Sequence, residues 1–336
     1  MSHFRDRLAA TAQPQTGSPF FERLPSEIRQ KIYQELWDLY DTRWHVHTLG
    51  VPGPLGPVFP CITTPEEEDI RWNKFQTSLS EDLGIWESRL RSPWNAHWKC
   101  AEAASTKLSR LQKRRATPAD PVKFRPLLLS SPLLVCRRMY IENIVALENV
   151  FTYCLTDTIV ARNFLTEYST TRNIRNLDIS LRIKPVITEL YFPGPDGEPQ
   201  PHIGGITITS KNNPWEDLCR QLASLPNLHT VHIRLDSEDL RPWHKRVNES
   251  KFFEQLLQVK ARRFVLDLPE IPDQPELQAL PGCYLEVGVL KDMAYEVKRS
   301  QRPNNWQLHL SRISHVLPEN WSHTLWNQVR EKIHAV

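Results

Sequence analysis

Glycine is scarce in this sequence, and the loops that depend on glycine are missing with it. The 336 residues include 11 glycines against 27 prolines, a balance that favours rigid loops and leaves few backbone positions that only glycine can adopt. The sequence contains no Walker A loop, dinucleotide-binding fingerprint, nucleophile elbow, zincin helix or EF-hand loop. We therefore expect a protein that is not an enzyme and that carries no cofactor.

A strong net charge and a long apolar run are also missing. Lysine and arginine number 42 and aspartate and glutamate 39, for a net charge of +3, so no strong field favours nucleic acid or an anionic membrane. The longest apolar stretch, residues 126–135, is interrupted by Ser130, Ser131 and Pro132 and is shorter than the roughly 20 residues of a membrane span. Residues 1–18 lack the apolar core of a secretory signal. We expect an intracellular protein, cytoplasmic or nuclear.

Closely spaced cysteine pairs are absent, and the six scattered cysteines indicate reduced thiols. Five side chains that could bind a soft metal nevertheless occur in the first hundred residues: His45, His47, Cys61, His97 and Cys100. His97 and Cys100, three residues apart, would share one face of a helix, so a structural zinc is physically possible. The neighbouring tryptophans indicate ordinary aromatic packing instead. Packing is the favoured interpretation, and no metal is expected.

The composition changes along the chain and divides it into four segments. Residues 1–19 form a polar tail, and residues 20–49 carry an apolar helix and a short strand. Residues 50–121 look like an insertion, with a Pro/Gly loop followed by tryptophan-rich helices. In residues 122–336 strands and helices alternate, which predicts an α/β fold with a mostly parallel sheet, with α+β as the alternative.

The hydrophobic periodicity places the individual elements. Strands are predicted at 43–49, 58–62, 149–155, 174–183, 203–209, 228–235, 263–268 and 284–290. Helices are predicted at 25–40, 80–91, 94–113, 132–147, 158–168, 214–224, 249–259 and 319–334. Three strands share an apolar-x-x-apolar-x-apolar spacing that starts at Ile174, Leu228 and Ala261 and is typical of leucine-rich repeats. The intervals are uneven, so we predict an irregular, leucine-rich-like sheet.

A basic run lies near the end of the insertion and consists of Lys107, Arg110, Lys113, Arg114 and Arg115. Solvated helical faces often have this composition. The alternatives are a nuclear-import signal or a phosphate-binding patch. Aromatic residues are not interleaved with the basic ones, as they would be in a protein that binds single strands. Nucleic acid is therefore the less favoured partner.

The first predicted helix carries two apolar stripes. One consists of Ile28, Ile32, Leu36 and Leu39, and the next of Tyr33, Trp37 and Tyr40. Together they are wider than the single face that a surface helix needs to pack on one core. Two interpretations remain open: a helix enclosed within its own domain, or a helix with one face for its domain and another for a partner.

Three motifs carry a family resemblance. Residues 24–36 (LPSEIRQKIYQEL) resemble the opening of an F-box, and residues 132–140 (PLLVCRRMY) resemble its second half. The combination of LP-x-EIR-x-x-IY from Leu24, CR-x-x-Y-x-E from Cys136 and N-x-F from Asn149 is similar to the fungal F-box-like proteins grouped as domain of unknown function 7730 (DUF7730). The resemblance implies a split F-box-like unit followed by a leucine-rich-like α/β region.

The same resemblance implies a non-catalytic role in protein–protein contact. The N-terminal helices would dock a Skp-type adaptor of a cullin ubiquitin ligase, and the α/β region would select a target protein. Leu24 and Pro25 would anchor the adaptor, and Ile28, Ile32 and Leu36 would be shared between the core and the partner. The alternative is a structural or nuclear interaction protein in which the F-box-like motif is only a folding unit.

Overall fold

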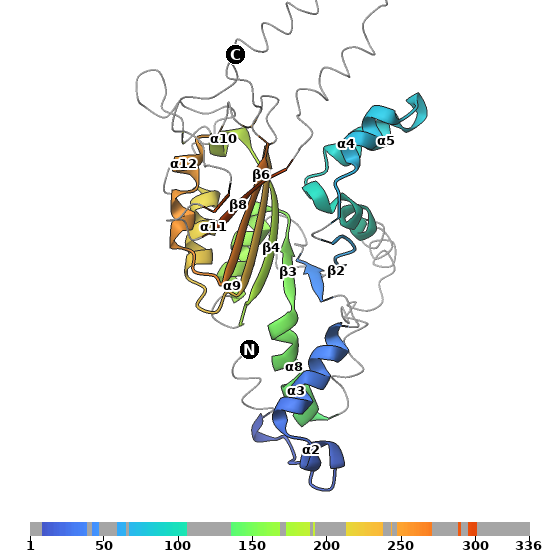
Figure 1. The fold of residues 1–336 in the computed structure, drawn as a ribbon, viewed down its shortest axis with the longest axis vertical. Coiled ribbons are helices and arrows are strands. Elements are labelled where there is room, and N and C mark those ends of the chain that lie inside the picture. Colours follow the sequence, from blue (N-terminus) through green and yellow to red (C-terminus); the bar gives the residue numbers. More distant parts are fainter. Residues whose placement is uncertain are drawn as a thin grey trace, which may run out of the picture.

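A mostly parallel sheet forms the centre of the protein, with helices on both faces and a helical pair at one end (Figure 1). The structure is a computed structural model. It describes residues 9–38, 42–46, 59–64, 67–105, 136–168, 173–188, 191, 213–237, 243, 247–270, 288–289 and 295–300. The predicted α/β class is confirmed.

The inner strands of the sheet lie in the order in which they occur along the chain. Within the described ranges the sheet has eight strands in the order β2-β1-β3-β4-β5-β6-β8-β7. Neighbours from β1 to β8 are parallel, and the edge strands β2 and β7 are antiparallel. The bounds are β1 Arg43–His45, β2 Phe59–Pro60, β3 Thr152–Leu155, β4 Asn176–Ile183, β5 Thr230–Ser237, β6 Arg263–Pro269, β7 Gly288–Val289 and β8 Glu296–Ser300. Every crossover between parallel strands therefore advances in the same direction, as in leucine-rich repeats.

Helices that follow the strands cover one face of this sheet and bury the main core. They are α9 (Thr158–Tyr168), α11 (Pro214–Ala223), α12 (Glu249–Phe252) and the 3-10 helix η4 (Glu254–Gln258), with the short α10 (Pro185–Thr188) at the sheet's end. Leu177, Val231 and Phe264 are register partners on adjacent strands and are buried in this core. The shared apolar spacing of the three strands thus places equivalent side chains next to one another across the sheet.

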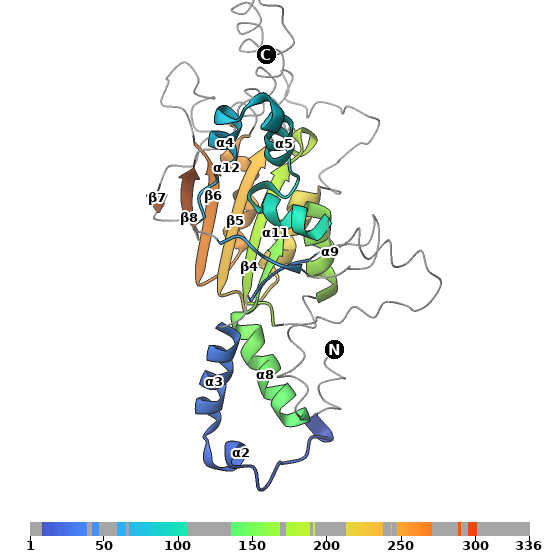
Figure 2. The same cartoon turned by 90° about the vertical axis from the view of Figure 1, so that its right-hand side faces the viewer.

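The opposite face is covered by residues 67–105, here called the helical cover, which lie in front of the strands in Figure 2. The cover contains α4 (Arg71–Thr77), α5 (Ser80–Leu90), the 3-10 helix η1 (Asn95–His97) and helical residues at 98–105. Its small core is centred on Phe75 and Leu90. The helix predicted at 80–91 is confirmed, and the one at 94–113 is described as far as residue 105.

The N-terminal helices project from one end of the sheet (Figure 2). They are α2 (Pro19–Arg23) and α3 (Ser26–Asp38), and α8 (Arg137–Val150) packs against α3. Among the described residues, no helix has both the length and the apolar character of a membrane-spanning segment.

Some predicted boundaries were wrong. The helix predicted at 132–147 begins at Arg137, where the Cys136 sulfur caps it by accepting a hydrogen bond from the Met139 N–H at 3.3 Å, and it runs on to Val150. The strand predicted at 149–155 begins at Thr152, the helix at 249–259 divides into α12 and η4, and β8 was not predicted. The predicted strand at 203–209, the predicted helix at 319–334 and the basic run lie outside the described residues.

Candidate functional site

The α3–α8 pair brings together two of the three motif segments. The guanidinium of Arg29 donates two hydrogen bonds to the Glu142 carboxylate, from Nε at 2.8 Å and from Nη2 at 2.9 Å. The Tyr33 hydroxyl donates to the same carboxylate at 3.2 Å. These three residues are the arginine, tyrosine and glutamate of the EIR-x-x-IY and CR-x-x-Y-x-E motifs. The motifs therefore encode the contact that joins the two helices.

The charges at this contact stabilise one another. Burial alone would raise the pKa of Glu142, but the hydrogen bonds and charge of Arg29 hold the pKa below its ordinary value. Burial, and then the charge of Glu142, raise the pKa of Tyr33, so its phenol stays protonated and able to donate. Arg29 also donates from Nη1 to the Leu24 carbonyl at 2.5 Å, which fixes the turn before α3.

The two apolar stripes of α3 have different surroundings. Tyr33 and Trp37 are fully buried in the main core. Ile28 and Ile32 are each 42% exposed. The predicted contact residues Leu24, Pro25, Ile28, Ile32 and Leu36, here called the α3 stripe, are half-buried or exposed. Leu39 and Tyr40 lie outside the described residues. The helix is thus held by Tyr33 and Trp37, while Ile28 and Ile32 remain accessible to solvent.

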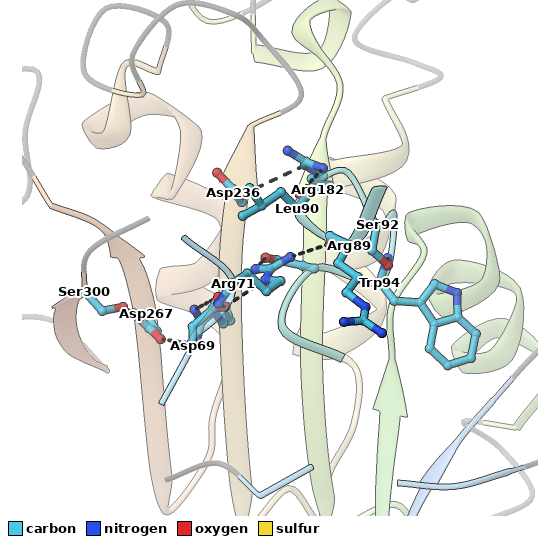
Figure 3. Close-up of polar contacts among 12 residues, drawn as sticks. Asp69, Arg71, Arg89, Leu90, Ser92, Trp94, Arg182, Asp236, Asp267 and Ser300 are labelled. Atoms are coloured by element: carbon cyan, nitrogen blue, oxygen red, sulfur yellow. Dashed lines mark hydrogen bonds and ion pairs between the residues drawn. The ribbon is translucent and has the colours of Figure 1, made fainter. Parts of the chain in front are cut away.

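Buried charges join the helical cover to the sheet (Figure 3). Arg71, at the start of α4, is 1% exposed and donates to the Asp69 carboxylate at 2.6 and 2.8 Å. Arg234 of β5 donates to the same carboxylate at 3.1 Å. Burial opposes the charged form of Asp69, yet the two arginines lower its pKa to about 2. One carboxylate therefore connects the cover to the centre of the sheet.

The polar network extends across the neighbouring strands. Arg234 also lies 3.8 Å from the carboxylate of Asp267 on β6, which accepts a hydrogen bond from the Ser300 hydroxyl on β8 at 2.6 Å. Arg182 of β4 donates to the Leu90 carbonyl at the end of α5 at 3.0 Å. Figure 3 shows Arg182 beside Leu90 of the cover, and Asp267 beside Ser300. Polar contacts thus join the cover to β4 and β5 and continue across the sheet to β6 and β8.

Four of the five side chains considered as soft-metal ligands come together at the other end of the cover. The ligand atoms of His45, Cys61, His97 and Cys100 all lie within 4.8 Å of one another, and all four residues are buried. His47 lies outside the described residues. The expected aromatic packing is also present, since the His45 and Trp94 rings lie 4.8 Å apart. Burial lowers the pKa of His45, which favours the neutral, metal-binding imidazole.

Sequence reasoning missed the charged partners of these sites. Glu142 and Arg29 stood within motifs, but nothing in the sequence paired them. Asp69 was not singled out. Neither was Asp178, whose carboxylate lies 3.7 Å from His97 Nε2, although it stands at an alternating polar position of a predicted strand. A carboxylate at such a position is a weak signal, because it is equally typical of a strand face in water.

Parallel strands in chain order, crossover helices on one face and a helical pair at one end define a mixed α/β protein with a mostly parallel sheet. Residues 92–285 match the family described as domain of unknown function DUF7730, so the chain belongs to the DUF7730 family. The match extends from the second half of the cover to β6 and beyond. No curated protein and no solved structure matches the chain.

Proposed function

We propose that this protein is a non-catalytic interaction protein whose α3 stripe docks a Skp-type adaptor of a cullin ubiquitin ligase. The observation that carries the proposal is the exposure of Ile28 and Ile32, 42% each, on a helix whose Tyr33 and Trp37 side chains are fully buried. An exposed apolar stripe on a well-held helix suits recognition by a groove of a partner protein. The α/β region would then present the target protein to the ligase.

The ion pair beneath the stripe supports this role. Arg29 and Glu142 hold α3 against α8, and Arg29 fixes the Leu24 carbonyl at the turn before α3. A surface that is ordered before binding loses little conformational entropy when the partner docks. The α3 stripe therefore has the preorganisation that a docking surface needs.

Co-purification of the full chain with a Skp-type adaptor tests the proposal. The unaltered chain should retain the adaptor at one copy per chain. A variant with both Ile28→Ser and Ile32→Ser should lose at least about tenfold in affinity, because central apolar anchors contribute most of the binding energy. Both side chains are exposed, so circular dichroism should show an unchanged fold.

The matched control is Leu257→Ser, since Leu257 is 45% exposed but lies on η4, away from α3. This variant should retain the adaptor. Failure of the unaltered chain to bind, or equal loss in the control, would overturn the adaptor role. The motif would then be a folding unit of a protein with other partners.

A further inference from the structure

We propose that His45, Cys61, His97 and Cys100 bind one structural zinc ion that ties the helical cover to the edge of the sheet. The residues come from separate segments: His45 ends β1, Cys61 follows β2, His97 lies in η1 and Cys100 lies in the helical residues 98–105. Their exposed fractions are 0%, 2%, 5% and 2%. Two thiols and two imidazoles are a donor set typical of structural zinc.

The distances among the ligand atoms fit a tetrahedral ion. The sulfur atoms of Cys61 and Cys100 lie 3.9 Å apart, and Cys61 Sγ lies 3.5 Å from His97 Nδ1. Zinc at about 2.3 Å from sulfur and about 2.0 Å from nitrogen places such pairs about 3.8 and 3.6 Å apart. A disulfide would need a separation of about 2.05 Å, and both cysteines are free. The spacing therefore matches a shared metal ion.

A second observation concerns the ring nitrogens of His45 and also points to a metal ion. Both ring nitrogens of His45 are buried and have no hydrogen-bond partner among the described residues. Burying an imidazole without partners is unfavourable, and such groups are rare in folded proteins. A metal bound to one of these nitrogens would satisfy it, because neutral imidazole nitrogen is a common zinc ligand.

The surroundings of His97 suit a metal ligand as well. Its Nε2 lies 3.7 Å from the carboxylate of Asp178 on β4, and zinc-binding histidines commonly donate their second N–H to a carboxylate. This leaves Nδ1 for the metal, which is the nitrogen nearest Cys61. The Thr63 hydroxyl, now 2.9 Å from Nδ1, also lies 3.3 Å from Cys61 Sγ, and it would donate to that sulfur once zinc is bound.

The Cys100 sulfur already accepts a hydrogen bond from the Ile62 backbone N–H at 3.4 Å. Such a bond stabilises a thiolate, the form of cysteine that binds metal. With four protein ligands and no open position, the ion would be structural and would not activate water. It would fix β1, the residue after β2 and the second half of the cover relative to one another.

Metal analysis of the full chain, purified under reducing conditions, tests the proposal. After incubation with excess zinc and gel filtration, we expect one zinc per chain. X-ray absorption should show two sulfur and two nitrogen neighbours at about 2.3 and 2.0–2.1 Å. This measurement needs no variant. Less than a tenth of an equivalent of zinc, or a different sulfur count, would overturn the proposed site.

Two substitutions provide an independent comparison. Cys100→Ser should reduce the zinc content to background. Cys219→Ser alters an equally buried cysteine, on α11 in the main core, and should retain the full zinc content. Retention of zinc by a folded Cys100→Ser variant would contradict the site. Loss of zinc in both variants would contradict it equally, because the metal would then report general unfolding.

Discussion

The two faces of the sheet are both buried, but they are covered by different chemistry. On the face packed by α9, α11 and α12, the strand side chains are apolar, as in the fully buried row Val231, Ile233 and Leu235 of β5. On the face under the helical cover, the alternate residues include Asp178 and Asp267, which are only 5% and 8% exposed. One face is stabilised mainly by apolar burial, and the other by paired charges.

This difference follows from the topology. Crossovers of one hand that advance in one direction place their helices on a single face, and α9, α11 and α12, which lie between β3 and β6 in the chain, are all on one face (Figure 1). The second face is covered by residues 67–105, which belong to the long connection between β2 and β3. Its charges are tolerated because each has a partner, such as Asp69 with Arg71 and Arg234. The cover is thus attached by specific polar contacts, whereas the helices on the opposite face are attached by packing.

The largest effect is expected on the apolar face. Trp215 of α11 is fully buried, stacks on Phe252 with ring centroids 4.7 Å apart, and donates from Nε1 to the Phe252 carbonyl at 2.8 Å. Trp215→Ala should lower the free energy of unfolding in urea by about 4 kcal/mol. Ile85→Ala, at a half-exposed position of α5, should cost less than about 0.5 kcal/mol. Similar values for the two would refute the assignment of the main core.

A smaller loss is expected on the polar face. Asp69→Asn should destabilise the protein at neutral pH by about 3 kcal/mol, because Arg71 would remain buried without its counter-charge and Arg234 would lose this carboxylate and keep the more distant one of Asp267. The control is Glu102→Gln, which removes the exposed carboxylate of the Arg89–Glu102 pair and should cost less than about 0.5 kcal/mol. Equal effects in urea titrations would show that the buried network contributes no more than a surface pair.

The same network predicts a pH dependence that the apolar face lacks. The pKa of Asp69 is lowered to about 2, against about 3.9 in an unfolded chain. The carboxylate therefore adds about 3 kcal/mol of stability above pH 4, which is lost as the pH falls from about 4 to 2. The difference in unfolding free energy between the unaltered chain and Asp69→Asn should shrink over this range. The difference in unfolding free energy for Trp215→Ala should stay constant. If both differences shrank together, the pH dependence would not belong to the polar face.

The smallest effect concerns the edge of the polar network. Ser300→Ala removes the hydroxyl that donates to Asp267 at 2.6 Å and should cost about 1 kcal/mol. Ser224→Ala serves as the control, since its hydroxyl donates to the Gln221 carbonyl at an exposed helix end. If the two substitutions have the same effect on urea unfolding, the network does not extend to β8.

The apolar face could be predicted from the sequence, and the polar face could not. The shared spacing of the strands from Ile174, Leu228 and Ala261 identified side chains that lie in one row, because alternation places every second residue on one face. The same alternation gives no information about the other face. The polar and apolar residues around Asp178 alternate in the same way whether water or a protein segment covers that face of the strand. The residues that cover it are distant in the chain.

The candidate sites, too, could be predicted from the sequence only in part. The stripes of α3 were visible in the helical periodicity, but only the packing against α8 separates buried Tyr33 from half-exposed Ile32. His97 and Cys100 were recognisable as a helical pair of ligands. Their approach to Cys61 depends on β2 pairing with β1, a long-range contact across a loop, so the favoured interpretation of packing alone followed from local sequence.

If separate interactions hold the two faces of the sheet, hydrogen exchange of the zinc-loaded full chain, with and without a chelator, should respond on one face only. We predict that removal of zinc speeds exchange of the backbone amides at 95–105 at least tenfold, a loss of about 1.4 kcal/mol of local stability. The amides of α11 and β5 should be unchanged. Unchanged exchange at 95–105, or an equal increase on both faces, would contradict separate attachment of the two faces.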